Sequence, residues 1–222
     1  MYTRRLIFIM AIGAALCAVL TLAAARSPYF PGDVAIARAV QAALPGPAGW
    51  AQWITSTAAI PDCFVLLALT ILAAWLISGW RAALLAPAIF FGLLGLGLSL
   101  SPLVAQPRPS PALVNVVGHP RGHAFPSISG LVYVATFGYV GVLAAIHLRG
   151  ILRALVPALA TAALIACACA RVVLGAHWPS DLWSAYLIGL VCIGFLVLLF
   201  RTKLADDAGE REAAERVKNN RG

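Results

Sequence analysis

Three residues whose side chains can carry out phosphoryl chemistry lie in one short stretch: Arg171, His177 and Asp181. The stretch separates two long apolar runs, and ionisable groups beside hydrocarbon are costly enough to indicate a functional site. Pro179 suits the first turn of a helix, and the spacing of His177 and Asp181 places both on one helix face. Gly175 allows a bend that brings His177 back toward Arg171. An imidazole with a carboxylate behind it and a guanidinium in front can attack a phosphoryl group.

A purely structural role also explains these residues. Arg171 would then anchor a helix end at the lipid surface, and Asp181 would complement the dipole of the next helix. The stretch by itself leaves both interpretations open.

The composition indicates a membrane protein. Of the 222 residues, 62% are hydrophobic and 11% are charged, and the mean hydropathy is +0.91, whereas soluble domains carry about 25% charged residues. The net charge of +8 is scattered between apolar runs, which disfavours a nucleic-acid partner and favours membrane lipids. The five cysteines have no metal-ligand spacing with histidines, so no metal or other cofactor is expected.

The hydropathy pattern predicts an all-α, polytopic bundle of six transmembrane helices. A short amphipathic helix over 34–44 would lie on the external surface, with Trp50 and Trp53 at headgroup depth. The first span is interpreted as a retained helix, although it resembles a secretory signal. The expected spans are 6–25, 63–78, 82–105, 130–148, 154–174 and 182–200. A membrane domain over 1–203, with external loops at 26–62, 106–129 and 175–181, would precede a charged cytoplasmic tail over 204–222.

The basic residues predict the orientation. With six spans, eleven of the 16 Lys and Arg residues fall on the side that holds both termini. The positive-inside rule then places both termini in the cytoplasm, as for a multi-pass protein of a bacterial-type inner membrane. The loop 106–129 and the stretch 171–181 would share the external, periplasmic face.

Two further clusters would meet Arg171–Asp181 on that face. Arg108 lies in a stiff Pro-Arg-Pro turn, and Ser127 directly precedes the fourth span. Because a helix N-terminus binds anions readily, this junction can hold a phosphate. Arginines, a helix N-terminus and a His–Asp pair predict a phosphate-processing site, since phosphoryl transfer depends on positioning and charge neutralisation.

The pattern resembles the type 2 phosphatidic acid phosphatase family, the membrane branch of the acid phosphatase and vanadium haloperoxidase superfamily. Its signatures are Lys-x6-Arg-Pro, Pro-Ser-Gly-His and Ser-Arg-x5-His-x3-Asp, and the third is matched from Arg171 through His177 to Asp181, with the wording Gly-Ala-His-Trp-Pro-Ser-Asp. The resemblance implies a metal-independent lipid phosphatase. His177 would be the nucleophile of a phosphohistidine intermediate, Asp181 would orient it, and Arg108, Arg171 and Ser127 would bind phosphate.

The chain departs from these signatures at three positions. Ser101 stands at the lysine, Ser129 at the histidine of the second signature, and Ala170 at the serine of the third. In the family that histidine is the general acid, whose contribution is on the order of 10²–10⁴ in rate. A serine hydroxyl does not titrate near neutrality and is a poor substitute.

Three explanations follow. His119, His123, Arg121 or Ser129 itself could compensate for the missing groups. Alternatively, the substrate needs no acid, as for a polyprenyl diphosphate such as undecaprenyl diphosphate, whose leaving group is a phosphate monoester. Thirdly, the protein is an impaired pseudophosphatase that binds a lipid phosphate or a partner. A lipid phosphotransferase remains an alternative, and a transporter or structural membrane protein is the rival from another class. Transporters place polar residues near the bilayer midplane, whereas here they lie mostly at span ends.

Overall fold

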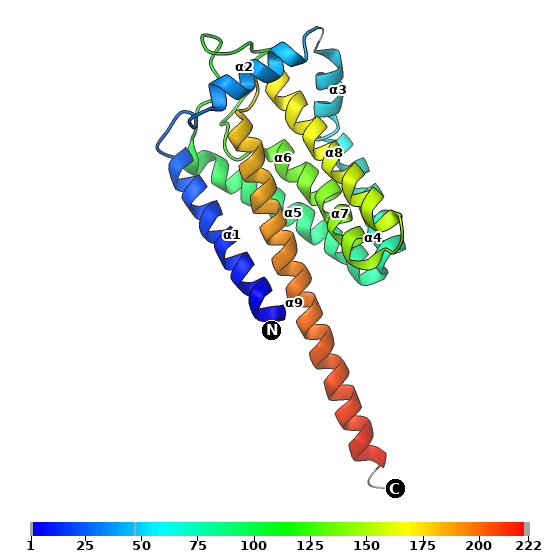
Figure 1. Cartoon of the computed structure of the whole chain (residues 1–222). Helices are drawn as coiled ribbons and strands as arrows, with labels where there is room; N and C mark the ends of the chain where they lie inside the picture. Colours follow the sequence, from blue (N-terminus) through cyan, green and yellow to red (C-terminus); the bar gives the residue numbers. More distant parts are fainter. Residues whose placement is uncertain (1, 47, 220–222) are drawn as a thin grey trace.

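The chain folds into a bundle of helices (Figure 1). The structure, a computed structural model, describes residues 2–46 and 48–219, with side chains described for 7–46 and 48–200. Every element over the described residues is helical: α1 (Tyr2–Ala24), α2 (Asp33–Ala43), α3 (Gly49–Ser56), α4 (Asp62–Ser78), α5 (Trp80–Val104), α6 (Ile128–Tyr133), η1 (Val134–Gly138), α7 (Tyr139–His147), α8 (Leu152–Val173) and α9 (Pro179–Asn219).

Five helical stretches among the described residues are long and apolar enough to cross a membrane. They are Ile7–Ala24, Trp80–Val104, Ile128–His147, Leu152–Val173 and Pro179–Phe200. The expected span over 63–78 corresponds to α4, an apolar helix of 17 residues. The chain is therefore a multi-pass membrane protein with a helical bundle.

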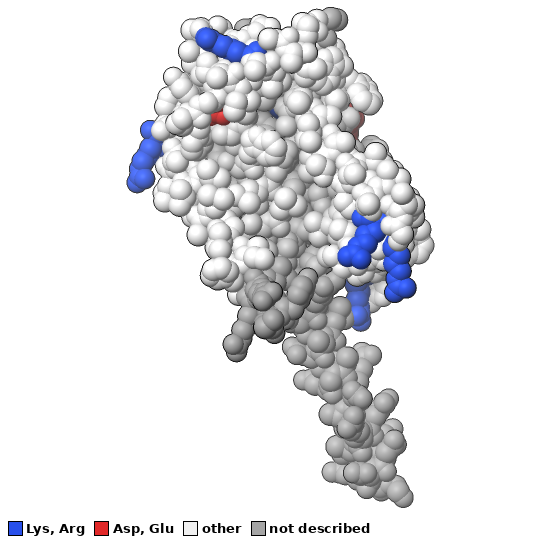
Figure 2. Space-filling view, in the orientation of Figure 1, with Lys and Arg blue, Asp and Glu red and all other residues white. Residues whose placement is uncertain are grey.

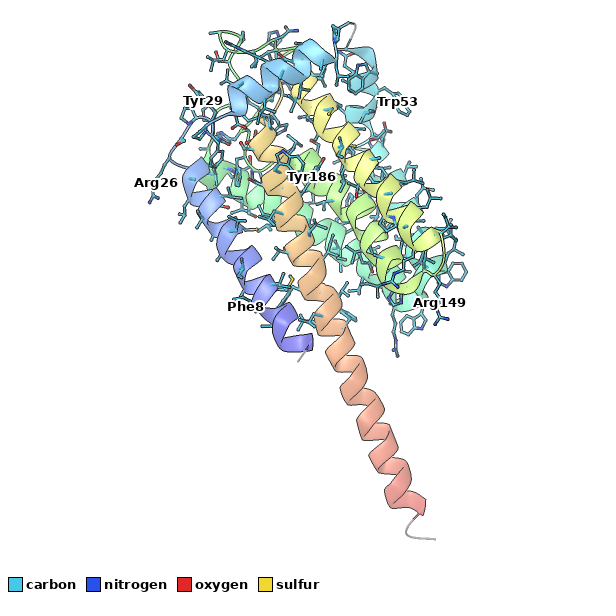
Figure 3. All side chains as sticks on the ribbon, in the orientation of Figure 1. Phe8, Arg26, Tyr29, Trp53, Arg149 and Tyr186 are labelled. Atoms are coloured by element: carbon cyan, nitrogen blue, oxygen red, sulfur yellow. The ribbon has the colours of Figure 1, made fainter. Side chains whose placement is uncertain are left out.

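The region between the first two expected spans holds two helices rather than one. The amphipathic helix predicted over 34–44 is α2, and Figure 1 shows it lying across one end of the bundle. α3 was not predicted, because the prolines and glycines before it indicated a loop. It forms through tertiary packing: Ala51 is fully buried with Val173 and Leu174 at the end of α8, while Trp53 points outward (Figure 3).

The span expected over 130–148 is not one regular helix, because the π-helical segment η1 separates α6 from α7. The Thr136 hydroxyl donates to the carbonyls of Val132 and Tyr133 at 3.0 and 3.2 Å, and such back-bonding competes with the regular helical ladder. This span is also the most buried of the five, at 67%. It forms the centre around which the other helices pack.

Small residues let the neighbouring helices approach this central span closely. Gly97 of α5 faces Leu131, Gly130 faces Ala185 of α9, and Gly189 of α9 faces Val134. In a bilayer, close backbone approach is a main source of helix association, because lipid tails are as apolar as the side chains. The glycines therefore set the distances between α5, α6 and α9.

Among the residues with described side chains, the basic ones lie mostly at the ends of the bundle. Basic side chains gather toward two ends of the molecule with an uncharged band between them (Figure 2); Arg26 and Arg149 lie at opposite ends (Figure 3). The loop 106–127, α2, the end of α8 and the start of α9 lie at the same end in Figure 1. The loop 106–127 contacts the stretch 171–181 there, through Arg108 and the Ala124 carbonyl.

Gly189 offers a test of this packing. A Cβ there would overlap the Val134 side chain, whereas a Cβ on Gly92 of α5 would meet nothing within 4 Å. We expect Gly189→Ala to lower the free energy of unfolding by about 1–3 kcal/mol, as overpacking usually does. Gly92→Ala, with the same helix-propensity gain, should not. Thermal unfolding of both variants in detergent measures the difference, and equal midpoints would contradict the proposed contact.

Candidate active site

His177 lies in the short turn between the end of α8 and the start of α9. Gly175 has φ +61°, and the N–H groups of Ala176 and Gly175 donate to the carbonyls of Arg171 and Val172 at 3.1 and 2.9 Å. These two bonds form a Schellman motif, which ends a helix at a residue in the left-handed conformation. We call residues 174–178 the His177 turn. The bend predicted at Gly175 is confirmed.

The helix that follows begins at Pro179, as the sequence predicted. Asp181 accepts the backbone N–H of Trp178 through Oδ2 at 2.8 Å. A carboxylate at the third helical position that reaches back to the preceding residue forms half of a capping box. Asp181 therefore has a clear structural role at the start of α9.

The hydrogen bonds of the His177 side chain select one tautomer. Nε2 accepts from Nη1 of Arg108 at 2.7 Å, so Nδ1 carries the proton and donates to the Ala124 carbonyl at 2.9 Å. Oδ2 of Asp181 lies 3.4 Å from Nδ1, farther than the Ala124 oxygen. The neutral imidazole thus has its lone pair on Nε2, on the side of Arg108.

Arg108 reaches His177 from the loop that follows α5. Its Nη1 also donates to the Ala176 carbonyl at 2.6 Å, and Nη2 donates to the Arg121 carbonyl at 2.9 Å. Its Nε is buried and has no hydrogen-bond partner among the described residues. The guanidinium therefore links two loops and retains an unmatched donor.

Burial and the two neighbouring guanidinium groups favour the neutral form of His177. Burial lowers the pKa of His177 well below its ordinary value, and the positive charges of Arg171 and Arg108 lower it further. Burial also lowers the pKa of Arg108, but a guanidinium still stays charged near neutrality. An uncharged nucleophilic nitrogen beside two cations is suited to a phosphate, which supplies the missing negative charge.

The second guanidinium comes from the last turn of α8. Arg171 acts on His177 through its charge, and its Nε is buried without a hydrogen-bond partner in the described part of the chain. Unmatched buried donors are costly, and an anion between the two arginines would satisfy them. Over the described residues, no group of three or more His, Cys, Asp or Glu side chains could hold a metal.

The remaining predicted site residues lie on the loop that follows α5 and at the start of α6. Ser127 is fully buried and is the N-cap of α6, where its hydroxyl accepts the Gly130 N–H at 3.2 Å and lies 3.2 Å from the Ser129 hydroxyl. His119 and Arg121 are exposed and His123 is half-buried. The Arg121 carbonyl holds Arg108, so this residue contacts the site through its backbone.

Ser101 and Ala170 stand where the chain departs from the first and third signatures. Ser101 is buried within α5, one turn before the helix ends, and its backbone carbonyl accepts the Ala105 N–H at 3.0 Å. Ala170 is fully buried with Ala51.

Two polar residues that the sequence analysis did not single out are built into this end of the bundle. Asp33 is 3% exposed and accepts hydrogen bonds from Ser180, and Gln41 bonds the end of α8. An aspartate at the start of an amphipathic helix and a lone glutamine on it are ordinary features. Their partners are more than 70 residues away, so no local sequence signal reveals them.

A search of family models and a search of curated proteins gave no match. Among solved structures, the fold is similar to "the first transmembrane PAP2 type phosphatidylglycerolphosphate phosphatase from Bacillus subtilis", with a TM-score of 0.64 and 22% identity. The match covers 91% of this chain and 98% of the other. At this identity the likeness shows that the two chains share a fold.

Gly175 tests how closely the His177 turn fits its surroundings. A Cβ there would overlap the Asn115 carbonyl oxygen and lie 2.9 Å from the Val116 Cα, whereas Gly118, with φ +74°, faces open space. Alanine at either position carries a left-handed strain of about 1–2 kcal/mol. We expect only Gly175→Ala to destabilise the protein beyond that strain. It should also speed hydrogen exchange of the Val117 amide, which bonds the Leu174 carbonyl. Equal effects of the two substitutions would contradict this close contact.

Proposed function

We propose that the chain is a lipid phosphate phosphatase of the PAP2 (type 2 phosphatidic acid phosphatase) family, with His177 as the nucleophile. The observation that carries the proposal is the neutral imidazole of His177, whose Nε2 lone pair faces the Arg108 guanidinium beside the charge of Arg171. The shared fold with a PAP2-type phosphatase supports it. So does the third signature, which runs from Arg171 to Asp181.

The reaction would proceed in two steps. The substrate phosphate would draw the Arg108 guanidinium from Nε2 to its own oxygens, with Arg171 and Ser127 as further phosphate ligands. Nε2 would then attack the terminal phosphorus as the bond from that phosphorus to the leaving-group oxygen breaks, and the Nδ1 proton would stay on the side of the Ala124 carbonyl and Asp181. Water would hydrolyse the phosphohistidine and release orthophosphate.

The serine at position 129 favours a substrate with a good leaving group. An alkoxide needs a proton as it leaves, and the hydroxyl of Ser129 does not titrate near neutrality. A diphosphate ester leaves as a phosphate monoester, which needs none. We therefore propose a polyprenyl diphosphate, with phosphatidylglycerol phosphate, named for the structural neighbour, as the rival substrate.

We propose that the chain crosses the membrane six times, through the five long apolar helical stretches and through α4. Both termini would then be cytoplasmic, and the site would face the outside of a bacterial-type inner membrane. The distribution of Lys and Arg residues supports this orientation. The substrate phosphate would reach the site from the external leaflet.

The first test is phosphate release by purified protein from polyprenyl diphosphate, phosphatidylglycerol phosphate and phosphatidate. We expect turnover of the diphosphate, and His177→Ala should reduce it by a factor of about 10³ or more, because no other group supplies the nucleophile. His147→Ala is the matched control, since His147 is exposed and is the last residue of α7. If the wild-type protein turns over no substrate, the alternative function is that of a pseudophosphatase. The serines at positions 101 and 129, where the family has lysine and histidine, support that alternative.

A second experiment examines the missing general acid. With the diphosphate substrate, we expect His123→Ala and His119→Ala to keep most of the activity, because its leaving group needs no proton. A loss of about 10²-fold or more in either variant would identify that histidine as a replacement acid. Such a result would contradict the leaving-group argument while leaving the phosphatase assignment intact.

The pH dependence of the reaction reports the state of His177. Its folded pKa is lowered by burial and by Arg171 and Arg108, so the imidazole loses its nucleophilic lone pair only well below pH 6.5. After correction for the titration of the substrate, we expect the acid limb of kcat/KM to have its midpoint below 6.5. A midpoint at or above 6.5 would show that His177 is not held neutral in this way.

A further inference from the structure

α2 lies across the two helix ends that flank His177. In Figure 1 it crosses the end of α8 and the start of α9. Its buried residue Ala37, 1% exposed, packs in one cluster with Val172 of α8 and Trp178 of the His177 turn. The helix also carries two polar side chains, Asp33 at its first residue and Gln41 near its last, which reach those two helix ends.

Asp33 contacts the start of α9. Its Oδ1 accepts the Ser180 N–H at 2.9 Å and its Oδ2 accepts the Ser180 hydroxyl at 2.6 Å; Oδ2 also accepts the Phe30 N–H at 2.7 Å. The first N–H groups of a helix have no partner within the helix, and a carboxylate also complements its dipole. Asp33 thus acts as a cap for α9 from 147 residues away.

Gln41 contacts the end of α8. Its Nε2 donates to the Val172 and Val173 carbonyls at 3.1 and 3.3 Å, which belong to the last turn of that helix. The same Nε2 donates to the Asn115 carbonyl at 2.7 Å, and Oε1 accepts the Asn115 N–H at 3.0 Å. Gln41 therefore joins the end of α8 to the loop that carries Arg108.

A third contact strengthens the link to that loop. Arg38, one turn before Gln41, donates from Nε to the Leu113 carbonyl at 2.7 Å. Asp33, Arg38 and Gln41 thus each contact either a helix end that flanks the His177 turn or the loop that carries Arg108. The arrangement is more specific than the packing of an amphipathic helix on a bundle requires.

We infer that α2 is a positioning element, in which Asp33 and Gln41 fix both ends of the His177 turn and so set the approach of Nε2 to the substrate phosphorus. Ser180 lies three residues after His177, and Val173 lies four residues before it, so little chain separates these anchors from the imidazole. Asp33 and Gln41 touch no reacting atom and are not catalytic residues. The inference rests on the proposed phosphatase function for its kinetic consequence.

A graded series of variants tests this role. Asp33→Ala removes both bonds to Ser180, Asp33→Asn keeps an acceptor for the Ser180 N–H, and Ser180→Ala loses only the hydroxyl bond. Because a misplacement of about 1 Å can cost 10²-fold in rate, we expect kcat to fall about 10²-fold in Asp33→Ala and about tenfold or less in the other two. KM should change less than about threefold, since Arg108 and Arg171 still bind phosphate. Recovery in Asp33→Asn distinguishes positioning from general destabilisation.

Two controls accompany the series. Gln52→Ala removes an exposed amide from the neighbouring α3 and should leave kcat unchanged, whereas Gln41→Ala should lower it. The double variant Asp33→Ala/Ser180→Ala should be no worse than Asp33→Ala alone, because residues that act through one another are not additive. Additive losses would show that Asp33 does not act through Ser180.

A measurement that needs no activity separates this inference from the proposed function. Hydrogen exchange of the amides over 174–182, in detergent, should speed at least tenfold in Asp33→Ala and in Gln41→Ala but not in Gln52→Ala. If the wild-type protein releases no phosphate from any substrate, the proposed function fails while exchange still decides whether α2 fixes the turn. Unchanged exchange together with unchanged kcat in Asp33→Ala would overturn the inference.

Discussion

The candidate site depends on one buried imidazole that is kept neutral. His177 donates from Nδ1 to the Ala124 carbonyl and accepts from Arg108 at Nε2. Protonation is opposed by burial and by two guanidinium groups. The Ala124 N–H in turn donates to the Gln106 carbonyl at 2.8 Å, so the residues that hold the tautomer belong to the same loop as Arg108. The position of the imidazole and that of the cation beside it are therefore set together.

Helix termini supply the local geometry of this centre. α8 ends in a Schellman motif at Gly175, α9 begins at Pro179, and Asp181 caps its first turn. Each feature satisfies backbone groups that would be left unpaired at a buried helix end. The structural interpretation of Asp181 is therefore supported by its shortest contact, the bond from the Trp178 N–H at 2.8 Å, while its Oδ2 lies 3.4 Å from Nδ1 of His177. The same residues close the turn and surround the imidazole.

In the proposed phosphatase, Arg108 and Arg171 would bind the phosphate and His177 would attack it, and the chain departs from the family signatures where a proton would be delivered. Ser129 stands beside Ser127 at the start of α6, and Ser101 lies within α5. Neither hydroxyl can replace a charge or supply a proton near neutrality. In a site without a general acid, the reaction rate depends on how readily the leaving group departs without a proton. The serine at position 129 therefore bears on which substrate is proposed.

The sequence by itself determined the helical class, most helix positions and the stretch that forms the His177 turn, because these depend on hydropathy and on local signals from Gly175, Pro179 and Asp181. It did not reveal α3, which tertiary packing decides, or the π-helical segment, where the Thr136 hydroxyl bonds the backbone of its own helix. Nor did it reveal Asp33 and Gln41, whose partners lie 74 to 147 residues away. The sequence also could not predict the tautomer of His177. The Ala124 carbonyl and Arg108, which set it, contact the imidazole only because the loop 106–127 folds over the ends of α8 and α9.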